Sequence, residues 1–169
     1  KSTASKVMKA LIDPAAADLM KFPTKELDLG LICSQNHLVA FDNLSDISKA
    51  QSNLLCQVVT GGNISVRKLY TTDDTVTIPL HSCLVLNGID IAGHGKDLLD
   101  RAIVLALPKI DPSQRKDEKE FWQEFNAAKP MLLGRYFDVL AQAVMVYPDT
   151  KPEKKPRMAD YYRWALAVT

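Results

Sequence analysis

Lys1 and Ser2 stand at the head of a helical pattern and could contact a phosphate group. In phosphate-binding loops, a glycine-rich turn ends in Lys followed by Ser or Thr at a helix N-terminus. The Lys side chain then reaches the terminal phosphates and the hydroxyl binds Mg²⁺. A Lys-Ser pair at a helix start also occurs by chance, so this dipeptide gains meaning only beside other residues of matching chemistry.

Two polar residues follow apolar runs that have the composition of strands. Asp42 comes after residues 38–41 and Asn87 after residues 83–86. Open α/β sheets bind ligands at the carboxyl ends of their strands. Asp42 could therefore hold Mg²⁺ through water, with Asn87 facing the same ligand. Alternatively, Asp42 could cap the loop that follows it, and Asn87 with Gly88 could form a turn.

Arg101 is the fourth candidate, just before the apolar run 103–107. A surface arginine paired with a carboxylate is the alternative interpretation. In this order and spacing, the four candidates together outweigh their separate alternatives and favour nucleotide chemistry.

The elements that must position these residues alternate between helix and strand. The helix over 4–12 carries Val7, Met8, Leu11 and Ile12 on its apolar face, with Lys6 and Lys9 off that face. Apolar runs without alternation predict buried strands of a parallel sheet, at 37–41, 83–86 and 103–107. Thr24 and Ser45 are the predicted N-caps of two intervening helices, a short strand is possible at 18–22, and residues 64–80 predict a β-hairpin.

The C-terminal part is predicted to be helical from Asp117 onward, with Pro130 as the first residue of a second helix and a last helix over 157–168. Between these helices, the basic and Pro-rich residues 151–157 are interpreted as a solvated linker. The pattern as a whole predicts an α/β fold with a helical C-terminal part.

Composition restricts the class of protein. The 169 residues carry a net charge of +1 and are 47% apolar, as in a soluble globular domain. Three scattered cysteines argue against a disulfide framework and a zinc cluster. No apolar run approaches the ~20 residues of a membrane span, so we expect a cytoplasmic protein that does not enter a membrane.

The order of these motifs resembles a known family, the AAA+-type P-loop ATPases of bacterial, phage and plasmid replication proteins, which are similar to superfamily 3 helicases and to the ATPase portions of primase-helicases. The match is carried by 40–43 (AFDN), 60–62 (TGG), 67–70 (RKLY), 86–89 (LNGI) and 98–101 (LLDR), and 156–160 (PRMAD) extends it. The resemblance implies a P-loop NTPase sheet with flanking helices and a β-hairpin insertion.

The resemblance also implies an ATP site with Mg²⁺. Lys1, Ser2 and Thr3 match the end of the Walker A loop and would bind the nucleotide. Ser2 and Asp42, the latter at the Walker B position, would hold the metal.

Three further residues would serve hydrolysis by the same resemblance. Asn87 matches sensor 1, and Arg101 matches an arginine finger that enters a neighbouring subunit's site in a ring. Asn43 stands where many AAA+ proteins have a Glu that positions water. Since an amide cannot accept the proton, this departure weakens hydrolysis without excluding it.

Nucleic acid, with DNA the expected form, would contact the hairpin. Asp73 and Asp74 near its tip would repel phosphate, so Arg67, Lys68 and Tyr70 on its flank are the better candidates. An ordinary strand face is an equal alternative.

Because residue 1 is Lys rather than Met, we expect the numbering to begin inside a longer chain, with the first strand and most of the phosphate loop missing. The predicted domains are an ATPase core over 1–110, a helical subdomain over 111–147, and a linker with a further helix over 148–169. The predicted function is an ATP-hydrolysing replication motor. A nucleotide-binding switch or scaffold, or a plain DNA-binding module, are the alternatives.

Overall fold

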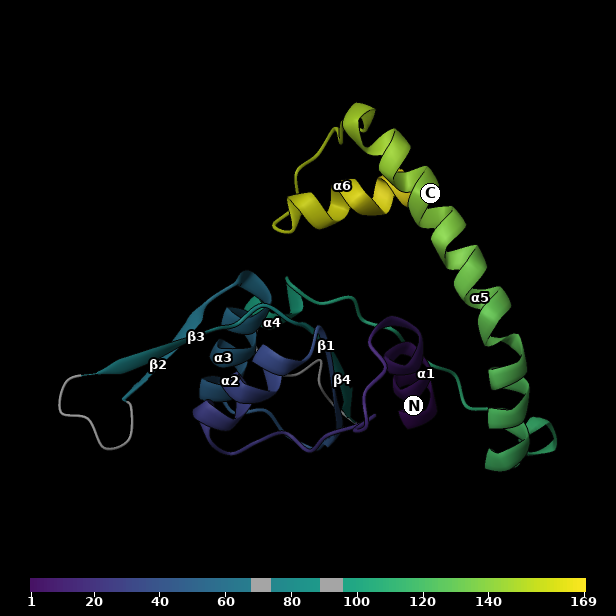
Figure 1. Ribbon diagram of the computed structural model, residues 1–169, viewed down its shortest axis with the longest axis horizontal. Helices are drawn as coiled ribbons and strands as arrows, with labels where there is room; N and C mark the ends of the chain where they lie inside the picture. The colour runs from purple at the N-terminus through teal and green to yellow at the C-terminus, as the bar shows by residue number, and fades with distance from the viewer. Residues whose placement is uncertain (68–73, 89–95) are drawn as a thin grey trace. The chain divides into compact units, whose positions relative to one another are not determined.

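The computed structural model describes residues 1–67, 74–88 and 96–169, and the chain divides into two compact units (Figure 1). The first unit comprises Lys1–Leu105 and the second Ala106–Thr169. Each unit is described by itself below.

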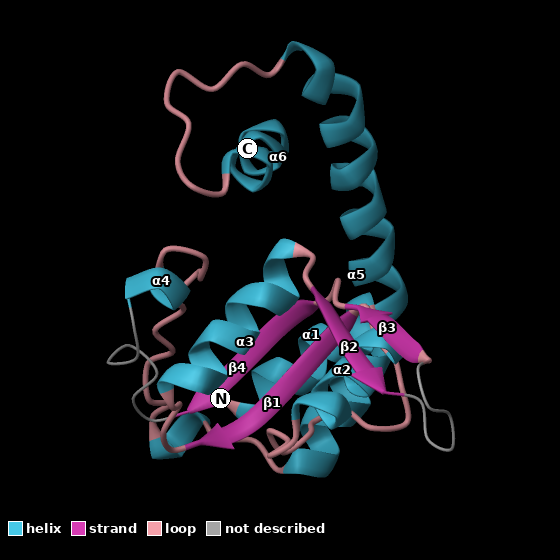
Figure 2. Cartoon of the chain, turned by 90° about the vertical axis from the view of Figure 1, so that its left-hand side faces the viewer, coloured by secondary structure: helices cyan, strands magenta, loops and turns pink. Residues whose placement is uncertain are grey.

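The first unit is built on a parallel pair of strands, β1 (Leu38–Leu44) and β4 (Cys83–Gly88). Figure 2 shows the two strands side by side. Leu38 lies opposite Cys83 and Phe41 opposite Leu86, so the carboxyl ends of both strands meet at one edge. Residues 38–41 are buried on both faces, as their apolar run predicts. On the other side of β1, Met20 forms an isolated parallel bridge with Phe41, in the segment where a short strand is possible.

Two of the predicted buried strands differ in the structure. In β4, Cys83 is exposed and residues 84–88 are only partly buried, because the described sheet pairs this strand on one side alone. Residues 103–107 form no strand: Ile103 is 60% and Val104 68% exposed. Apolar composition favours a strand only where a neighbouring strand can accept its backbone hydrogen bonds. The described part of the chain offers 103–107 no such neighbour.

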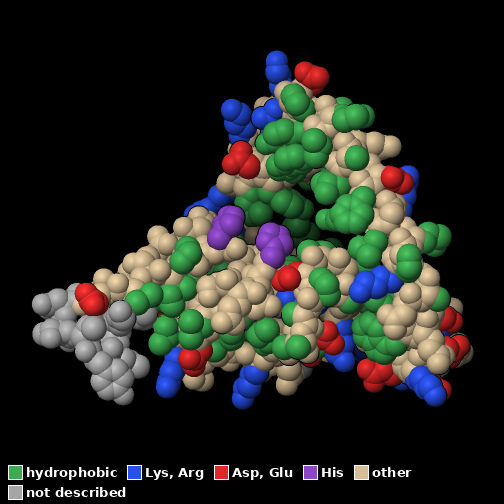
Figure 3. Space-filling model, viewed as in Figure 1, with side chains coloured by type: hydrophobic (Ala, Val, Ile, Leu, Met, Phe, Trp, Pro, Cys, Tyr) green, Lys and Arg blue, Asp and Glu red, His purple; other side chains and the backbone are tan. Residues whose placement is uncertain are grey.

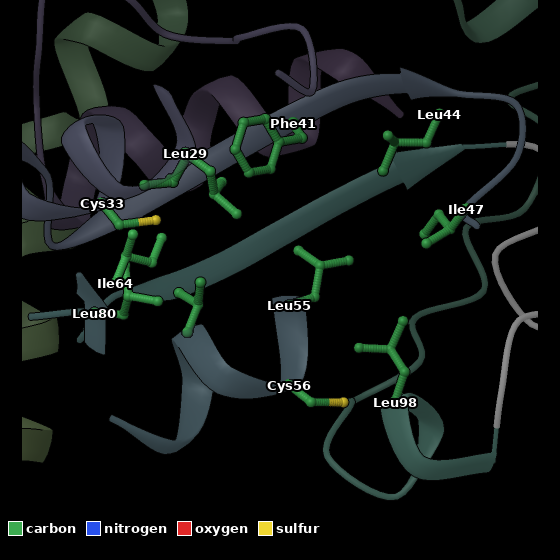
Figure 4. Close-up of a cluster of buried hydrophobic side chains, with 12 residues drawn as sticks. Leu29, Cys33, Phe41, Leu44, Ile47, Leu55, Cys56, Ile64, Leu80 and Leu98 are labelled. Carbon is green, nitrogen blue, oxygen red and sulfur yellow. The ribbon is translucent and has the colours of Figure 1, made fainter. Parts of the chain in front are cut away.

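Helices α2 (Glu26–Gln35), α3 (Lys49–Thr60) and α4 (Lys96–Leu99) contribute to the core of this unit. Figure 4 shows the side chains that meet there. They come from β1, from the three helices, from the strand at Asn63–Arg67 and from connecting segments, and include Leu29, Cys33, Phe41, Leu55, Ile64, Leu80 and Leu98.

Both predicted helix caps are wrong. Helix α3 is capped by Ser48, whose hydroxyl accepts from the Gln51 N–H while the Gln51 side chain accepts from the Ser48 N–H. This capping box is readable as Ser-x-x-Gln, whereas Ser45 lies too close to the end of β1. Helix α2 begins at Glu26, one residue later than a helix capped by Thr24 would, and no side chain caps it.

The predicted hairpin is confirmed. β2 (Asn63–Arg67) pairs antiparallel with β3 (Thr75–Pro79), with Ile64 opposite Ile78. Gly61 ends the preceding helix with φ of 81°, a left-handed conformation that glycine adopts without steric cost.

Helix α1 (Ser2–Ile12) packs against β1 and β4, but not through the predicted face. Ser5 and Lys9 are buried, whereas Ile12 is 43% exposed and the other apolar residues are only partly buried. Ser2, Ser5 and Lys9 are spaced as i, i+3 and i+7, so they share one helical face. The prediction that Lys9 lies outside the packed face is therefore wrong. Its side chain is buried because the ammonium group donates hydrogen bonds to three acceptors within the unit.

The second unit is helical, as predicted. It contains η1 (Pro112–Gln114), the 29-residue α5 (Glu118–Val146), η2 (Tyr147–Asp149) and α6 (Ala159–Val168). Pro130 lies inside α5 and does not begin a new helix. The strong helix formers around it, Ala127-Ala128 and Met131-Leu132-Leu133, continue the helix despite the missing N–H.

Candidate functional site

Three side chains from distant parts of the sequence meet in the first unit. The Ser2 hydroxyl donates to Oδ1 of Asp42 at 3.1 Å. Nδ2 of Asn87 donates to the Ser2 Oγ at 3.3 Å and also to the same Asp42 oxygen. We call Ser2, Asp42 and Asn87 the polar triad. It brings together three of the residues that the sequence predicts for one site.

The fold explains why the triad forms. Asp42 and Asn87 lie near the carboxyl ends of two paired parallel strands, and Ser2 is the first residue of α1. The Lys1 ammonium donates to the carbonyl of Gly88 at 3.1 Å, which holds the start of α1 beside the end of β4. Thr3 is exposed in the first turn of the same helix. The first turn of a helix carries backbone N–H groups without intrahelical partners, and these groups favour anions.

Asn43 has an unusual backbone at this edge of the sheet. Its φ is 57°, in the left-handed region, and the pairing register shifts between Phe41 and Leu44. Asn tolerates this conformation better than most residues, and such backbones recur at functional sites. The side chain of Asn43 is exposed beside Asp42.

Lys9 is a residue of this helix that the sequence reading missed. It is 1% exposed, and its Nζ donates to Asp13 Oδ2 at 2.8 Å, Asn36 Oδ1 at 3.0 Å and the Leu38 carbonyl at 2.6 Å. The hydrogen bond from Lys9, aided by the N–H of Leu38, lowers the pKa of the Asp13 carboxyl. These bonds hold the C-terminal end of α1 against the start of β1. The spacing of Lys9 and Asp13, four residues apart, is the sequence signal from which their ion pair could have been predicted.

Arg101 lies apart from the triad contacts. Its guanidinium Nη1 is 2.7 Å from Asp97 Oδ1 and donates to the Asp97 carbonyl at 2.8 Å. The hydrogen bond to Asp97 raises the pKa of Arg101 further above its ordinary value. The alternative interpretation, an arginine paired with a carboxylate, therefore describes Arg101 in this chain. An arginine finger completes the site of a neighbouring subunit, so Arg101 in that role would not contact the triad of its own chain.

The nucleic-acid candidates fall mainly outside the described residues. Lys68, Tyr70 and Asp73 are not described, and Arg67 closes β2 opposite Thr75. The structure confirms the hairpin that would carry them, and Asp74 is exposed at its other flank.

The donor set of the triad suits a hard cation. Mg²⁺ prefers oxygen ligands, keeps several waters and is held by one or two protein oxygens together with substrate phosphates. Ser2 offers a hydroxyl and Asp42 a carboxylate within one hydrogen-bonded cluster. The described ranges contain no group of three or more His, Cys, Asp or Glu side chains that could hold a metal by themselves.

The fold and the triad together define a mixed α/β unit with a two-stranded parallel sheet and a polar cluster at the carboxyl ends of its strands, the place where open parallel sheets bind ligands. A family model for actinomycete integrative conjugative element replication proteins matches residues 1–167, and the chain belongs to that family. The replication class expected from the sequence is thereby confirmed. Comparison with curated proteins and with solved structures gives no match. Within the described residues, no helix is long and apolar enough to cross a membrane.

Proposed function

We propose that this chain is the ATP-binding and ATP-hydrolysing part of a replication protein, with the P-loop fold that its motif order resembles. The single observation that carries the proposal is the polar triad. Ser2, Asp42 and Asn87 are separated by 40 and 45 residues, yet their side chains hydrogen-bond to one another. Three independent motif assignments would not be expected to converge by chance.

Each member of the triad has a distinct task in this proposal. Ser2 and Asp42 would hold Mg²⁺, which when bound neutralises phosphate charge. Asn87, whose amide now donates to both, would turn toward the terminal phosphate or the attacking water. Lys1, beside the Gly88 carbonyl, would supply the positive charge that the phosphates attract.

Hydrolysis in this site would depend on positioning and charge stabilisation. Phosphoryl transfer needs little covalent chemistry from the protein. Asn43, with its left-handed backbone, follows Asp42 directly near the end of β1, and Asp42 would hold the metal. An amide can orient water, although it cannot take its proton.

Assembly into a ring would bring Arg101 to a neighbour's site. In that arrangement Arg101 would exchange Asp97 for the charge that develops on the transferred phosphate. DNA is the nucleic acid on which a replication motor of this kind would act, with the β2–β3 hairpin as the predicted contact.

The test is ATP-dependent phosphate release by the protein with and without Asp42→Ala. We expect loss of Mg²⁺-dependent release and of Mg²⁺-ATP stabilisation against heat in this variant. Asp18→Ala removes an exposed carboxylate elsewhere in the same unit and should behave as wild type. Equal release by wild type and Asp42→Ala would refute the proposal.

A second candidate function is a nucleotide-binding switch with little hydrolysis. It is favoured by Asn43 at the position of the usual Glu and by the engagement of Arg101 with Asp97. Nucleotide binding that depends on Asp42, without phosphate release in the presence of DNA, would support the switch over the motor.

A further inference from the structure

Positive charge is concentrated in the segment between η2 and α6. Lys151, Lys154, Lys155 and Arg157 stand there against a single acid, Glu153, and all five are exposed. We call residues 151–157 the basic linker. Its charge is +3 while the whole chain carries +1, so the rest of the chain sums to −2. Figure 3 shows Lys and Arg side chains gathered at the top of the view, where this segment lies.

The two ends of the basic linker are fixed by one arginine. Arg163 of α6 donates from Nε to the Thr150 carbonyl at 2.9 Å, and from Nη2 to the carbonyls of Tyr147 at 2.8 Å and Pro148 at 3.1 Å. Its guanidinium lies 4.2 Å from the centre of the Tyr147 ring, on which Trp164 stacks at 3.9 Å. The linker is therefore a loop closed at its base.

The composition of the loop limits the entropy that binding would cost. Pro152 and Pro156 fix their own φ angles near −65° and restrict the residues before them. A binding segment that is already restricted loses less freedom when it meets its ligand. This loop thus differs from a flexible solvated linker, the interpretation favoured by the sequence alone.

Exposed aromatic rings follow the loop directly. Tyr161 is 48% and Tyr162 37% exposed in the first turns of α6, four and five residues after Arg157. Basic side chains that track a phosphate backbone, next to aromatic rings on which bases stack, are the two parts of a surface for single-stranded nucleic acid.

We propose that the basic linker and Tyr161 bind single-stranded DNA. The lysines contact phosphates and the tyrosine ring stacks on an unpaired base. A duplex leaves its bases stacked on each other and offers nothing to the ring, so single strands are preferred. This surface consists of residues of the second unit, whereas the triad consists of residues of the first, and the proposal does not depend on ATP hydrolysis.

The experiment measures binding of a fluorescent thymidine 20-mer to the full chain over a range of salt concentrations. Each neutralised phosphate of a single strand contributes about 0.7 to the slope of log affinity against log salt. Lys154→Ala with Lys155→Ala should lower that slope by about 1.4. The matched control, Lys109→Ala with Lys119→Ala, removes the same charge from exposed positions of the same unit and should leave the slope unchanged.

Tyr161 is tested separately from the charges. Tyr161→Ala should weaken binding by roughly 5- to 150-fold without changing the salt slope, since stacking is not ionic. Tyr161→Phe keeps the ring and should retain wild-type affinity. Thermal unfolding of every variant verifies that the fold is intact.

Four results would overturn the proposal. These are an equal loss of slope in the control pair, unchanged affinity in Tyr161→Ala, tighter binding of a duplex than of the single strand, and loss of the slope in Arg67→Ala alone. If the lysine pair is needed for binding to phosphatidylserine vesicles and not to the oligonucleotide, the surface is a membrane contact and the proposal is wrong. None of these results bears on whether the triad hydrolyses ATP.

Discussion

The side-chain amide of Asn87 donates a hydrogen bond to the carboxylate of Asp42 across two adjacent parallel strands. The bond joins an acid at the end of β1 to an amide at the end of β4. Since both also contact Ser2, the start of α1 is held at the same edge of the sheet.

Replacing Asn87 by Asp tests this relationship directly. Asn87→Asp places two carboxylates within hydrogen-bond distance, so the variant should lose about 1–3 kcal/mol of unfolding free energy at neutral pH. Lowering the pH, or adding Mg²⁺, should reduce this difference because either neutralises one charge. Urea unfolding at pH 5 and pH 7.5, with and without Mg²⁺, measures the effect. Asn87→Ala lacks the added charge and should show no recovery with Mg²⁺.

The ring assignment of Arg101 predicts complementation between inactive subunits. Arg101→Ala should abolish ATP turnover while sparing nucleotide binding, and Asp42→Ala should lose turnover through its own site. Mixed subunits should regain part of the activity, because an Asp42→Ala subunit still supplies Arg101 to its neighbour. Asp97→Ala removes the ion-pair partner and should keep turnover. Normal turnover by Arg101→Ala would exclude the finger role.

Lys9 should dominate the stability of α1. Lys9→Met removes the ammonium donor from the Leu38 carbonyl and from the Asp13 carboxylate, which keeps only the Leu38 N–H, and we expect a loss of about 2–3 kcal/mol. The partial exposure of Asp13, 25%, keeps the loss below that of a fully buried pair. Lys21→Met, at an exposed position, should change stability by less than about 0.5 kcal/mol. Equal effects of the two substitutions would contradict the buried role.

The lowered pKa of Asp13 gives stability a defined dependence on pH. Because the folded state lowers this pKa from its ordinary value of 3.8, the ionised carboxylate stabilises the protein at higher pH. That contribution is lost as pH falls below about 4 and through the folded value. Asp13→Asn should therefore flatten this part of the acid unfolding profile, measured by circular dichroism between pH 2 and pH 6.

Substitutions can distinguish the role of the Asn43 backbone conformation from the role of its side-chain amide. Asn43→Gly should leave stability within about 0.5 kcal/mol, whereas Asn43→Val should cost about 1–2 kcal/mol at a φ of 57°. If the amide orients water, both variants should lose phosphate release to a similar extent. A hydrolysis rate that follows stability instead would assign Asn43 a structural role alone.

The elements with a clear local pattern were the most predictable. The run before Asp42, the hairpin and the helix at residues 4–12 follow from local pattern, and the cap at Ser48 was available from its Gln51 partner. The continuation of α5 through Pro130 was not, because helix propensity on both sides outweighed a residue that usually ends or begins a helix.

The structures of two parts of the chain, residues 103–107 and Lys9, depend on tertiary partners that the local sequence pattern cannot identify. The run 103–107 is as apolar as a strand, but forming one needs a neighbouring edge. Lys9 looked like a surface residue, because burial of an ammonium group depends on three acceptors coming together. These are Asp13 just after α1, Asn36 just after α2 and Leu38 at the start of β1. Of the site, the triad was predictable by residue type and order. For Arg101, pairing with a carboxylate was the alternative interpretation, and the structure identifies the partner as Asp97.

The polar face of α1 has a consequence for how distant substitutions act. Ser2 and Lys9 lie on that face, seven residues or about 10 Å apart, and each end is held by directional bonds. A helix seated by hydrogen bonds cannot slide or rotate without breaking them, whereas one seated by apolar contacts can slip between similar packings. The hydrogen bonds at the two ends of β1, from Lys9 to Leu38 and from Ser2 to Asp42, are therefore coupled energetically through α1. A substitution that removes the hydrogen bonds of Lys9 should therefore weaken those of Ser2, although no residue of the triad is changed.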